Sequence, residues 1–174
     1  DGKSDYLVIP HTDAVSFRQE DFAISIWLRV PAQSGGGVFM KFDPKKKFRD
    51  YGGVTIFAEK QADQKQIQFR LSRSERLRYV LPDDAKEHSE WSHYIFQKTG
   101  KNISIYLDSK LVASREVNVL NTYKNDAPIV IGANNANLHR QNLIGEMDDV
   151  RIYNRALSAE EVKALYDLEK PKGK

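Results

Sequence analysis

Three carboxylates stand close together in the stretch GEMDDVRIY, near the C-terminal end of the chain. They are Glu146, Asp148 and Asp149. Such a cluster suits glycoside hydrolysis, in which one carboxylate attacks the sugar and another, about 5 Å away, protonates the leaving oxygen. It also suits a hard cation such as calcium, which prefers oxygen ligands. Strict alternation along a strand would place Glu146 and Asp148 on one face together with Val150 and Ile152, and Asp149 on the other face.

Other catalytic motifs are missing from the sequence. The four histidines show no H-E-x-x-H spacing, and the chain has neither a G-x-S-x-G elbow nor a phosphate-binding glycine loop. The chain also has no cysteine, which excludes disulfides, thiolate metal sites and cysteine nucleophiles. These patterns favour a protein that is not an enzyme.

Length and charge narrow the class further. The chain has 174 residues and a formal net charge of +3, with basic and acidic residues interspersed. We therefore expect one domain over residues 1–169, followed by a polar tail or linker over 170–174. We expect neither nucleic-acid binding nor membrane insertion, because no basic stripe and no long apolar stretch is present. The start at Asp1, without Met or a signal peptide, suggests a segment of a modular protein.

The elements that must position these residues are short strands. The segment FAISIWLRV, residues 22–30, alternates apolar and polar side chains, and so do QIQFRLS at 66–72 and NISIYLD at 102–108. Glycine-rich and polar turns separate them, and no helix of crossover length intervenes. This organisation predicts an all-β fold of antiparallel sheets packed face to face, as a β-sandwich or jelly roll.

One short helix is predicted at the C-terminal end. Ser158 and Glu161 form a capping box, and Val162, Leu165 and Tyr166 follow at helical spacing. We expect this amphipathic helix to dock on the sandwich.

The order of the segments DGKSDYLVIP, FAISIWLRV, WSHYIFQKTGKNISIYLDSKLVAS and IGANNANLHRQNLIGEMDDVRIYNRALSAEEV resembles the laminin-G-like domains of the concanavalin A-like lectin and glucanase superfamily. The resemblance implies a two-sheet antiparallel jelly roll with a concave and a convex face. Hydrolases of the superfamily carry an E-x-D-x-E strand, whereas this chain has Val150 at the place of the second glutamate. The resemblance therefore also implies a noncatalytic domain.

A structural calcium ion is a further implication of the resemblance. Its candidate ligands are Asp148 or Asp149 on the last strand and Asp1 or Asp5 on the first, provided that the two strands are neighbours. In the alternative, Asp148 accepts hydrogen bonds from nearby backbone amides.

Two loops combine the groups that sugar recognition needs, namely aromatic surface and hydrogen-bonding side chains. Their candidate ligand-binding residues are Lys41, Arg49, Tyr51, Asn134, Asn135, Asn137, His139 and Arg140. If the loops converge, their basic groups would favour a polymer with carboxylate or sulfate groups, although a neutral glycan is an alternative. The asparagines could also be turn formers only.

Further predictions concern a second surface, two core residues and one turn residue. A second possible surface is the sheet face expected to carry Trp27, Arg29, Gln68 and Arg70. Trp91 and His93 are expected in the core, and Asp108 is expected to shape a hairpin turn.

We therefore expect a noncatalytic carbohydrate-binding domain of a larger extracellular or cell-surface protein. Its partners would be a polysaccharide, possibly acidic, and the other domains of that protein. The alternative is a structural or adhesion domain that makes protein contacts without binding glycan, since fold does not fix function.

Overall fold

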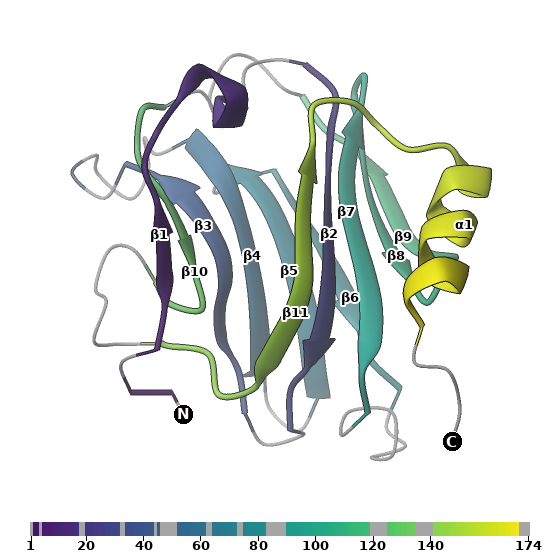
Figure 1. The fold of residues 1–174 in the computed structure, drawn as a ribbon, viewed down its shortest axis with the longest axis horizontal. Helices are drawn as coiled ribbons and strands as arrows, with labels where there is room; N and C mark the ends of the chain where they lie inside the picture. Colours follow the sequence, from purple (N-terminus) through teal and green to yellow (C-terminus); the bar gives the residue numbers. More distant parts are fainter. Residues whose placement is uncertain are drawn as a thin grey trace.

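The computed structural model describes residues 2–3, 5–17, 20–31, 34–43, 45, 52–61, 64–72, 75–82, 90–118, 125–134 and 141–170. Two antiparallel sheets face each other, with one helix on the outside (Figure 1). Sheet A contains, in spatial order, β1 (Leu7–Ile9), β10 (Ile129–Ile131), β3 (Gly36–Phe42), β4 (Gly52–Gln61), β5 (Gln64–Ser72) and β6 (Arg76–Val80). Sheet B contains β11 (Glu146–Tyr153), β2 (Phe22–Arg29), β7 (Ser92–Thr99), β8 (Asn102–Leu107) and β9 (Lys110–Glu116). The predicted two-sheet antiparallel sandwich is confirmed.

The core lies between the sheets and uses the alternation seen in the sequence. Phe22, Ile24 and Ile26 of β2 point inward and join Phe69 of β5 and Phe96 of β7 in one buried cluster. The rings of Phe69 and Phe96 meet edge to face, with centroids 5.7 Å apart. Full burial of one such side chain stabilises the fold by roughly 1.5–3 kcal/mol. Each alternating strand therefore turns its apolar side to the core, and the period-two pattern defines the inner faces.

The helix α1 (Ala159–Glu169) covers the outer face of sheet B, and a 3₁₀ turn, η1 (Asp13–Val15), follows β1. The predicted capping box is present: the Glu161 amide donates to Ser158 Oγ at 3.2 Å, and the Ser158 amide donates to Glu161 Oε2 at 2.8 Å. Val162 is fully buried and packs against Ala23 and Ile95 of the sheet. In the described part of the chain, no helix is both long and apolar enough to cross a membrane.

Strand β11 does not alternate strictly. Its register with β2 shifts between Asp148 and Arg151, which marks a β-bulge, and Asp149 adopts a positive φ of 48° there. The extra residue turns Val150 inward against the core, while Glu146 pairs with Arg29 on the outer side. The prediction that Glu146, Asp148, Val150 and Ile152 share a face is therefore wrong, because a bulge places two successive residues opposite one partner.

The two edges of the sandwich differ. At one edge β1 closes sheet A and β11 closes sheet B, and at the other edge β6 of sheet A approaches β9 of sheet B. Arg115 of β9 bridges the second edge, since its Nη1 donates to the backbone oxygen of Arg76 at 2.8 Å. This second edge holds the cleft described next.

Candidate ligand-binding cleft

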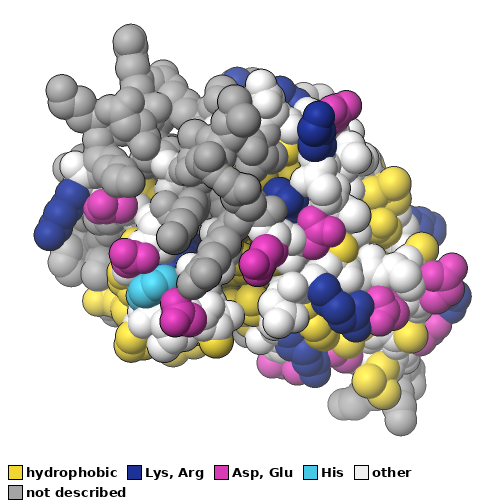
Figure 2. All heavy atoms as spheres, turned by 90° about the horizontal axis from the view of Figure 1, so that it is seen from above, with side chains coloured by type: hydrophobic (Ala, Val, Ile, Leu, Met, Phe, Trp, Pro, Cys, Tyr) yellow, Lys and Arg dark blue, Asp and Glu magenta, His cyan; other side chains and the backbone are white. Residues whose placement is uncertain are grey.

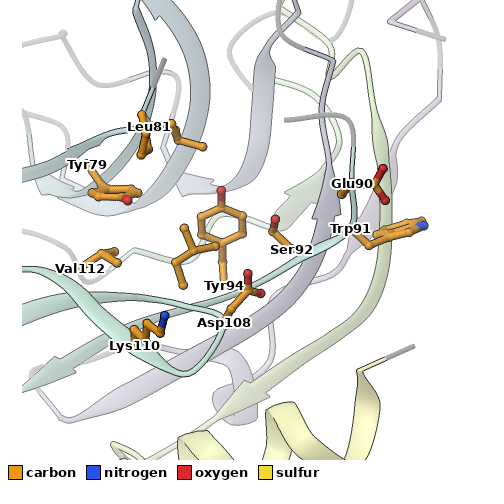
Figure 3. Close-up of a pocket in the computed structure, with 11 residues that line it drawn as sticks. Tyr79, Leu81, Glu90, Trp91, Ser92, Tyr94, Asp108, Lys110 and Val112 are labelled. Atoms are coloured by element: carbon orange, nitrogen blue, oxygen red, sulfur yellow. The ribbon is translucent and has the colours of Figure 1, made fainter. Parts of the chain in front are cut away.

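A cleft of about 450 Å³ opens between β6 of sheet A and the β8–β9 hairpin of sheet B (Figure 3). Its size falls within the usual range of small-molecule sites, roughly 300–1,000 Å³. The lining combines aromatic, aliphatic and polar side chains: Tyr79, Leu81, Pro82, Glu90, Trp91, Ser92, Tyr94, Leu107, Asp108, Lys110 and Val112.

Separate elements position these side chains. Tyr79 points inward from the edge strand β6, and Tyr94 does so from β7, where it is almost fully buried. Asp108 occupies the two-residue turn between β8 and β9, in which both Asp108 and Ser109 have positive φ angles, 47° and 67°. Two positive φ angles are typical of a tight hairpin turn, and Asp tolerates them well. The prediction that Asp108 shapes this turn is confirmed, and the same turn brings its carboxylate to the cleft.

The carboxylate of Asp108 is partly desolvated. Burial raises its pKa, while a hydrogen bond from the His93 amide, 2.9 Å from Oδ1, and the charge of Lys110 act in the opposite direction. A carboxylate has acceptor capacity for several hydrogen bonds, so Asp108 can accept further donors from a ligand. Lys110 and Ser92 add hydrogen-bond donors to the same lining.

Trp91 is not the core residue that was predicted. Its side chain is only partly buried, it lines the cleft, and the Arg29 guanidinium lies 5.5 Å from its ring centroid. Figure 3 shows its ring at one end of the cleft, apart from Tyr79 and Tyr94. The physical reason is that Trp91 precedes the first paired residue of β7, so the strand does not direct it inward. His93, in contrast, is buried as predicted, with 1% of its surface exposed.

The predicted loop residues lie elsewhere. Lys41 of β3 is buried, and its Nζ donates to the Ala127 oxygen at 2.6 Å. Burial lowers its pKa, with Asp126 acting in the opposite direction. Asn134 follows β10 and donates to Gln141 Oε1 at 2.7 Å. Because β10 runs antiparallel to β3, Lys41 and Asn134 lie at opposite ends of this strand pair, and the structure does not bring them together.

The remaining predicted ligand-binding residues are outside the described part of the chain: Arg49, Tyr51, Asn135, Asn137, His139 and Arg140. Their role in a shared rim stays a prediction.

The calcium candidates are divided between the two sheets. Asp5 precedes β1, which pairs with β10 in sheet A, whereas Asp148 and Asp149 belong to β11, which pairs with β2 in sheet B. The prediction required the two strands to be neighbours, but β1 and β11 are not hydrogen-bonded to each other. Asp148 Oδ1 instead accepts a hydrogen bond from the Asp149 amide at 2.8 Å. Asp1 is not described, and among the described residues no group of three His, Asp or Glu side chains is arranged for a metal.

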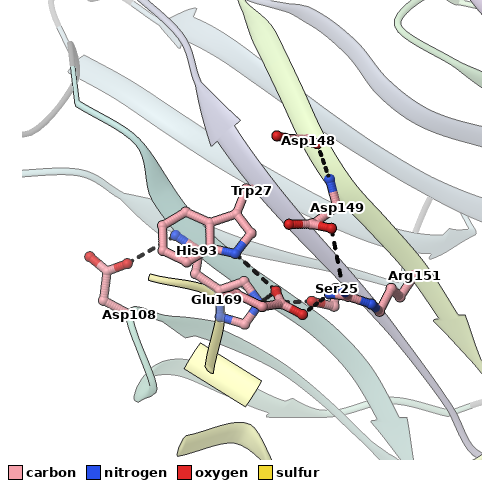
Figure 4. A network of polar contacts seen from close by, with 8 residues as sticks. All are labelled: Ser25, Trp27, His93, Asp108, Asp148, Asp149, Arg151 and Glu169. Carbon is pink, nitrogen blue, oxygen red and sulfur yellow. Dashed lines mark hydrogen bonds and ion pairs between the residues drawn. The ribbon is translucent and has the colours of Figure 1, made fainter. Parts of the chain in front are cut away.

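A buried polar cluster lies between sheet B and α1 (Figure 4). Ser25 Oγ is 2.7 Å from His93 Nε2, and Glu169 Oε2 is 3.9 Å from the same nitrogen. A catalytic triad needs the carboxylate at the other ring nitrogen and an accessible hydroxyl, but Ser25 is fully buried. This cluster therefore attaches the helix to the sheet and is not a nucleophilic site.

The second predicted surface is not a single face. Trp27 belongs to sheet B, where it is 5% exposed and stacks on Tyr166 of α1. Gln68 and Arg70 belong to β5 of sheet A. The prediction was wrong because alternation shows which residues of a strand share a face but does not assign that strand to a sheet.

Sequence reasoning did not identify the cleft as a site. Its lining comes from β6, the start of β7 and the β8–β9 hairpin, which are separated along the chain. The available signal was the segment RLRYVLP, in which Leu77, Tyr79 and Leu81 alternate with Arg76 and Arg78. This alternation predicts a strand, but only the packing of β6 against β9 makes it one wall of a cleft.

The two antiparallel sheets form a sandwich of the jelly-roll class. The family model of the concanavalin A-like lectin/glucanases superfamily, of the laminin G 3 type, matches residues 1–163, and the chain belongs to this family. No curated protein sequence matches the chain.

Solved structures share the fold at low identity. The binding domain of Paraclostridial Mosquitocidal Protein 1 is 19% identical, with a TM-score of 0.71 over 94% of this chain and 41% of that one. The botulinum neurotoxin serotype D ligand-binding domain, in complex with N-acetylneuraminic acid, is 13% identical, with a TM-score of 0.70 over 97% and 41%. The binding domain of botulinum neurotoxin DC, in complex with rat synaptotagmin II, is 16% identical, with a TM-score of 0.64 over 94% and 40%. The chain thus spans about two fifths of the length of these structures.

Proposed function

We propose that this protein is a noncatalytic carbohydrate-binding domain that holds a glycan in the cleft between β6 and the β8–β9 hairpin. The observation that carries the proposal is the composition of this cleft. Tyr79 and Trp91 bring partly exposed aromatic rings to its lining, which also includes the nearly buried Tyr94 and the polar groups of Asp108 and Lys110. Sugar rings present an apolar face together with a rim of hydroxyls, so they need both kinds of contact.

The surroundings of Glu146 support a noncatalytic role. This carboxylate forms an ion pair with Arg29 on the outer side of sheet B, and Val150 packs against the core. Retaining hydrolysis needs two carboxyl groups about 5 Å apart at the scissile bond. Val150 cannot act as the second one.

The similar structures give the proposal context without deciding it. One neurotoxin domain is in complex with N-acetylneuraminic acid, a sugar, and another is in complex with synaptotagmin II, a protein. As part of the proposal, and by the family resemblance, we place this domain in a larger extracellular or cell-surface protein and expect it to bind a polysaccharide.

The test is binding of a panel of neutral and acidic polysaccharides to the parent domain and to three variants. Trp91→Ala and Lys110→Ala each remove one cleft contact, and Leu111→Ala changes a neighbouring exposed side chain that does not line the cleft. We expect the first two variants to lose affinity at least fivefold and the third to bind like the parent. Unchanged binding by both cleft variants would reject the cleft.

The loop prediction is tested in the same panel. If Arg140→Ala and Tyr51→Ala weaken binding while the cleft variants do not, the glycan site belongs to the loops. If no polysaccharide binds at all, the proposed function is wrong.

A second function is favoured by one observation at the opposite edge. Leu7 and Val8 of the edge strand β1 are 66% and 49% exposed, and Ile144 is 46% exposed. Exposed apolar side chains on an unpaired strand edge suit contact with another protein. If glycans fail, Leu7→Asp should abolish the binding of a protein partner while the domain remains folded by circular dichroism.

A further inference from the structure

The outward side of the edge strand β6 carries two arginines, Arg76 and Arg78. In the register between β5 and β6, Arg76 lies opposite Arg70 and Arg78 lies opposite Gln68. Directly opposed like charges destabilise a sheet, so this arrangement has a cost in the absence of an anion.

The charges on this surface are not fully balanced. Arg70 Nη2 is 3.7 Å from Glu59, its guanidinium lies 5.2 Å from the ring centroid of Phe57, and Gln68 accepts from it. Arg115 is 3.7 Å from Glu75. Arg76 and Arg78 are exposed, and within the described ranges no carboxylate lies at ion-pair distance from either guanidinium.

Neighbouring arginines also affect the pKa of Arg76. Partial desolvation lowers the pKa of Arg76, followed by the positive charges of Arg78 and Arg70, while Glu59 raises it. Arg76 thus lies among other positive charges, with Glu59 acting in the opposite direction. Acidic and basic side chains are mixed over the end of the sandwich that is uppermost in Figure 1, as Figure 2 shows.

The position of β6 connects this surface to the cleft. Successive side chains of a strand point to opposite faces. Tyr79 consequently lines the cleft on the inner side, while its neighbours Arg78 and Val80 point outward. Because β6 is the edge strand of sheet A, a polymer leaving the cleft can pass over this edge and reach both arginines.

We infer that Arg76 and Arg78 bind the sulfate or carboxylate groups of an acidic polysaccharide, part of which occupies the cleft. This inference rests on the proposed function and specifies its ligand class. Guanidinium groups form paired hydrogen bonds with such oxyanions. Glu59, Glu75 and Glu90 lie around the arginines and the cleft, and the net charge is only +3, which disfavours the dense phosphates of a nucleic acid.

The experiment compares one sulfated polysaccharide with its chemically desulfated form, by isothermal titration calorimetry. The Arg76→Ala/Arg78→Ala variant should bind the sulfated polymer at least tenfold more weakly than the parent, with a smaller salt dependence. Binding of the desulfated polymer should change less than twofold. Lys163→Ala/Lys170→Ala is the matched control, because it removes two exposed basic groups from α1 and its C-cap, and it should bind like the parent.

The outcomes separate this inference from the proposed function. If Trp91→Ala weakens binding of both polymers but the arginine variant binds both like the parent, the inference is wrong and the proposed function stands. If neither polymer binds to the parent, both are wrong. If duplex DNA binds more tightly than the sulfated polymer and needs the same arginines, the ligand class is wrong. Arg76→Lys/Arg78→Lys should retain part of the affinity, because lysine keeps the charge but loses the paired hydrogen bonds.

Discussion

The indole Nε1 of Trp27 donates a hydrogen bond to Glu169 Oε2 at 2.9 Å, across a sequence separation of 142 residues. Trp27 lies on β2, and Glu169 is the last residue of α1, so this contact joins the end of the helix to the outer face of sheet B. Arg151 of β11 forms an ion pair with the same carboxylate (Figure 4). The Glu169 side chain is only 4% exposed, which makes it a buried charge with partners on two strands.

We expect Glu169→Ala to lower the free energy of unfolding by about 1–3 kcal/mol, because the buried indole N–H of Trp27 would lose its acceptor. Urea denaturation measures this change. Leu168→Ala is the control on the same helix: this side chain is 77% exposed, and its loss should alter the free energy by less than about 0.5 kcal/mol. Equal effects of the two substitutions would contradict a role for Glu169 in docking α1.

Stability should fall in mildly acidic solution because of His93. Burial, and secondarily the charge of Arg151, lower its pKa from 6.5 to about 4. The unfolded chain therefore binds the proton more readily than the folded one. This contribution is present above about pH 6.5 and is lost as the pH falls toward 4, with a total of at most about 3 kcal/mol.

The comparison of the parent with His93→Gln isolates this contribution, since the carboxylates titrate in both proteins. The difference in unfolding free energy between them should change between pH 7 and pH 4, with the parent losing more. A constant difference, or an NMR titration of His93 with a midpoint near 6.5, would contradict the prediction.

Calcium binding stays a proposal from the family resemblance alone, since β1 and β11 do not pair, and thermal unfolding tests it. An ion bound only by the folded state stabilises by mass action, by about 2.7 kcal/mol at a hundredfold excess over the dissociation constant. We expect millimolar calcium to raise the melting temperature and EDTA to reverse the rise, and Asp148→Asn to reduce the effect. A melting temperature that neither addition moves would reject the calcium site.

The domain should not cleave polysaccharides. Glu146 is paired with Arg29, and Val150 is directed into the core. The position of the second catalytic carboxylate is therefore occupied by a side chain that cannot act as acid or base. Incubation with β-glucans and acidic polymers should release no new reducing ends or unsaturated products. Product formation that Glu146→Gln abolishes would show that the domain is an enzyme.

Strand faces and the start of the helix could be predicted from residues that are close in sequence. The alternation along FAISIWLRV was sufficient to predict which face of β2 is buried, because one face of each strand must leave water. The capping box of Ser158 and Glu161 likewise depends on residues three positions apart, and the helix begins where it was predicted. In both cases the interacting groups are close in sequence, so the sequence alone contains the information.

The bulge in β11 was not predictable from alternation. The shift at Asp149 depends on pairing with β2, more than 100 residues earlier, and it reverses the direction of Val150. The prediction that Trp91 lies in the core was wrong for a similar reason, since its exposure depends on where β7 begins to pair with β2.

The sequence by itself determined the strand pattern, the final helix and the membership of an all-β sandwich family, because these follow from side-chain periodicity and short-range hydrogen bonds. The tertiary structure alone decided which strands share a sheet and which edges meet. It separated Trp27 from Arg70 onto different sheets and brought Tyr79 of β6 and Asp108 of the β8–β9 turn into the lining of one cleft. Such placements are set by hydrogen bonding and packing between strands distant in the chain. The side-chain pattern within one strand does not identify the strand with which it pairs.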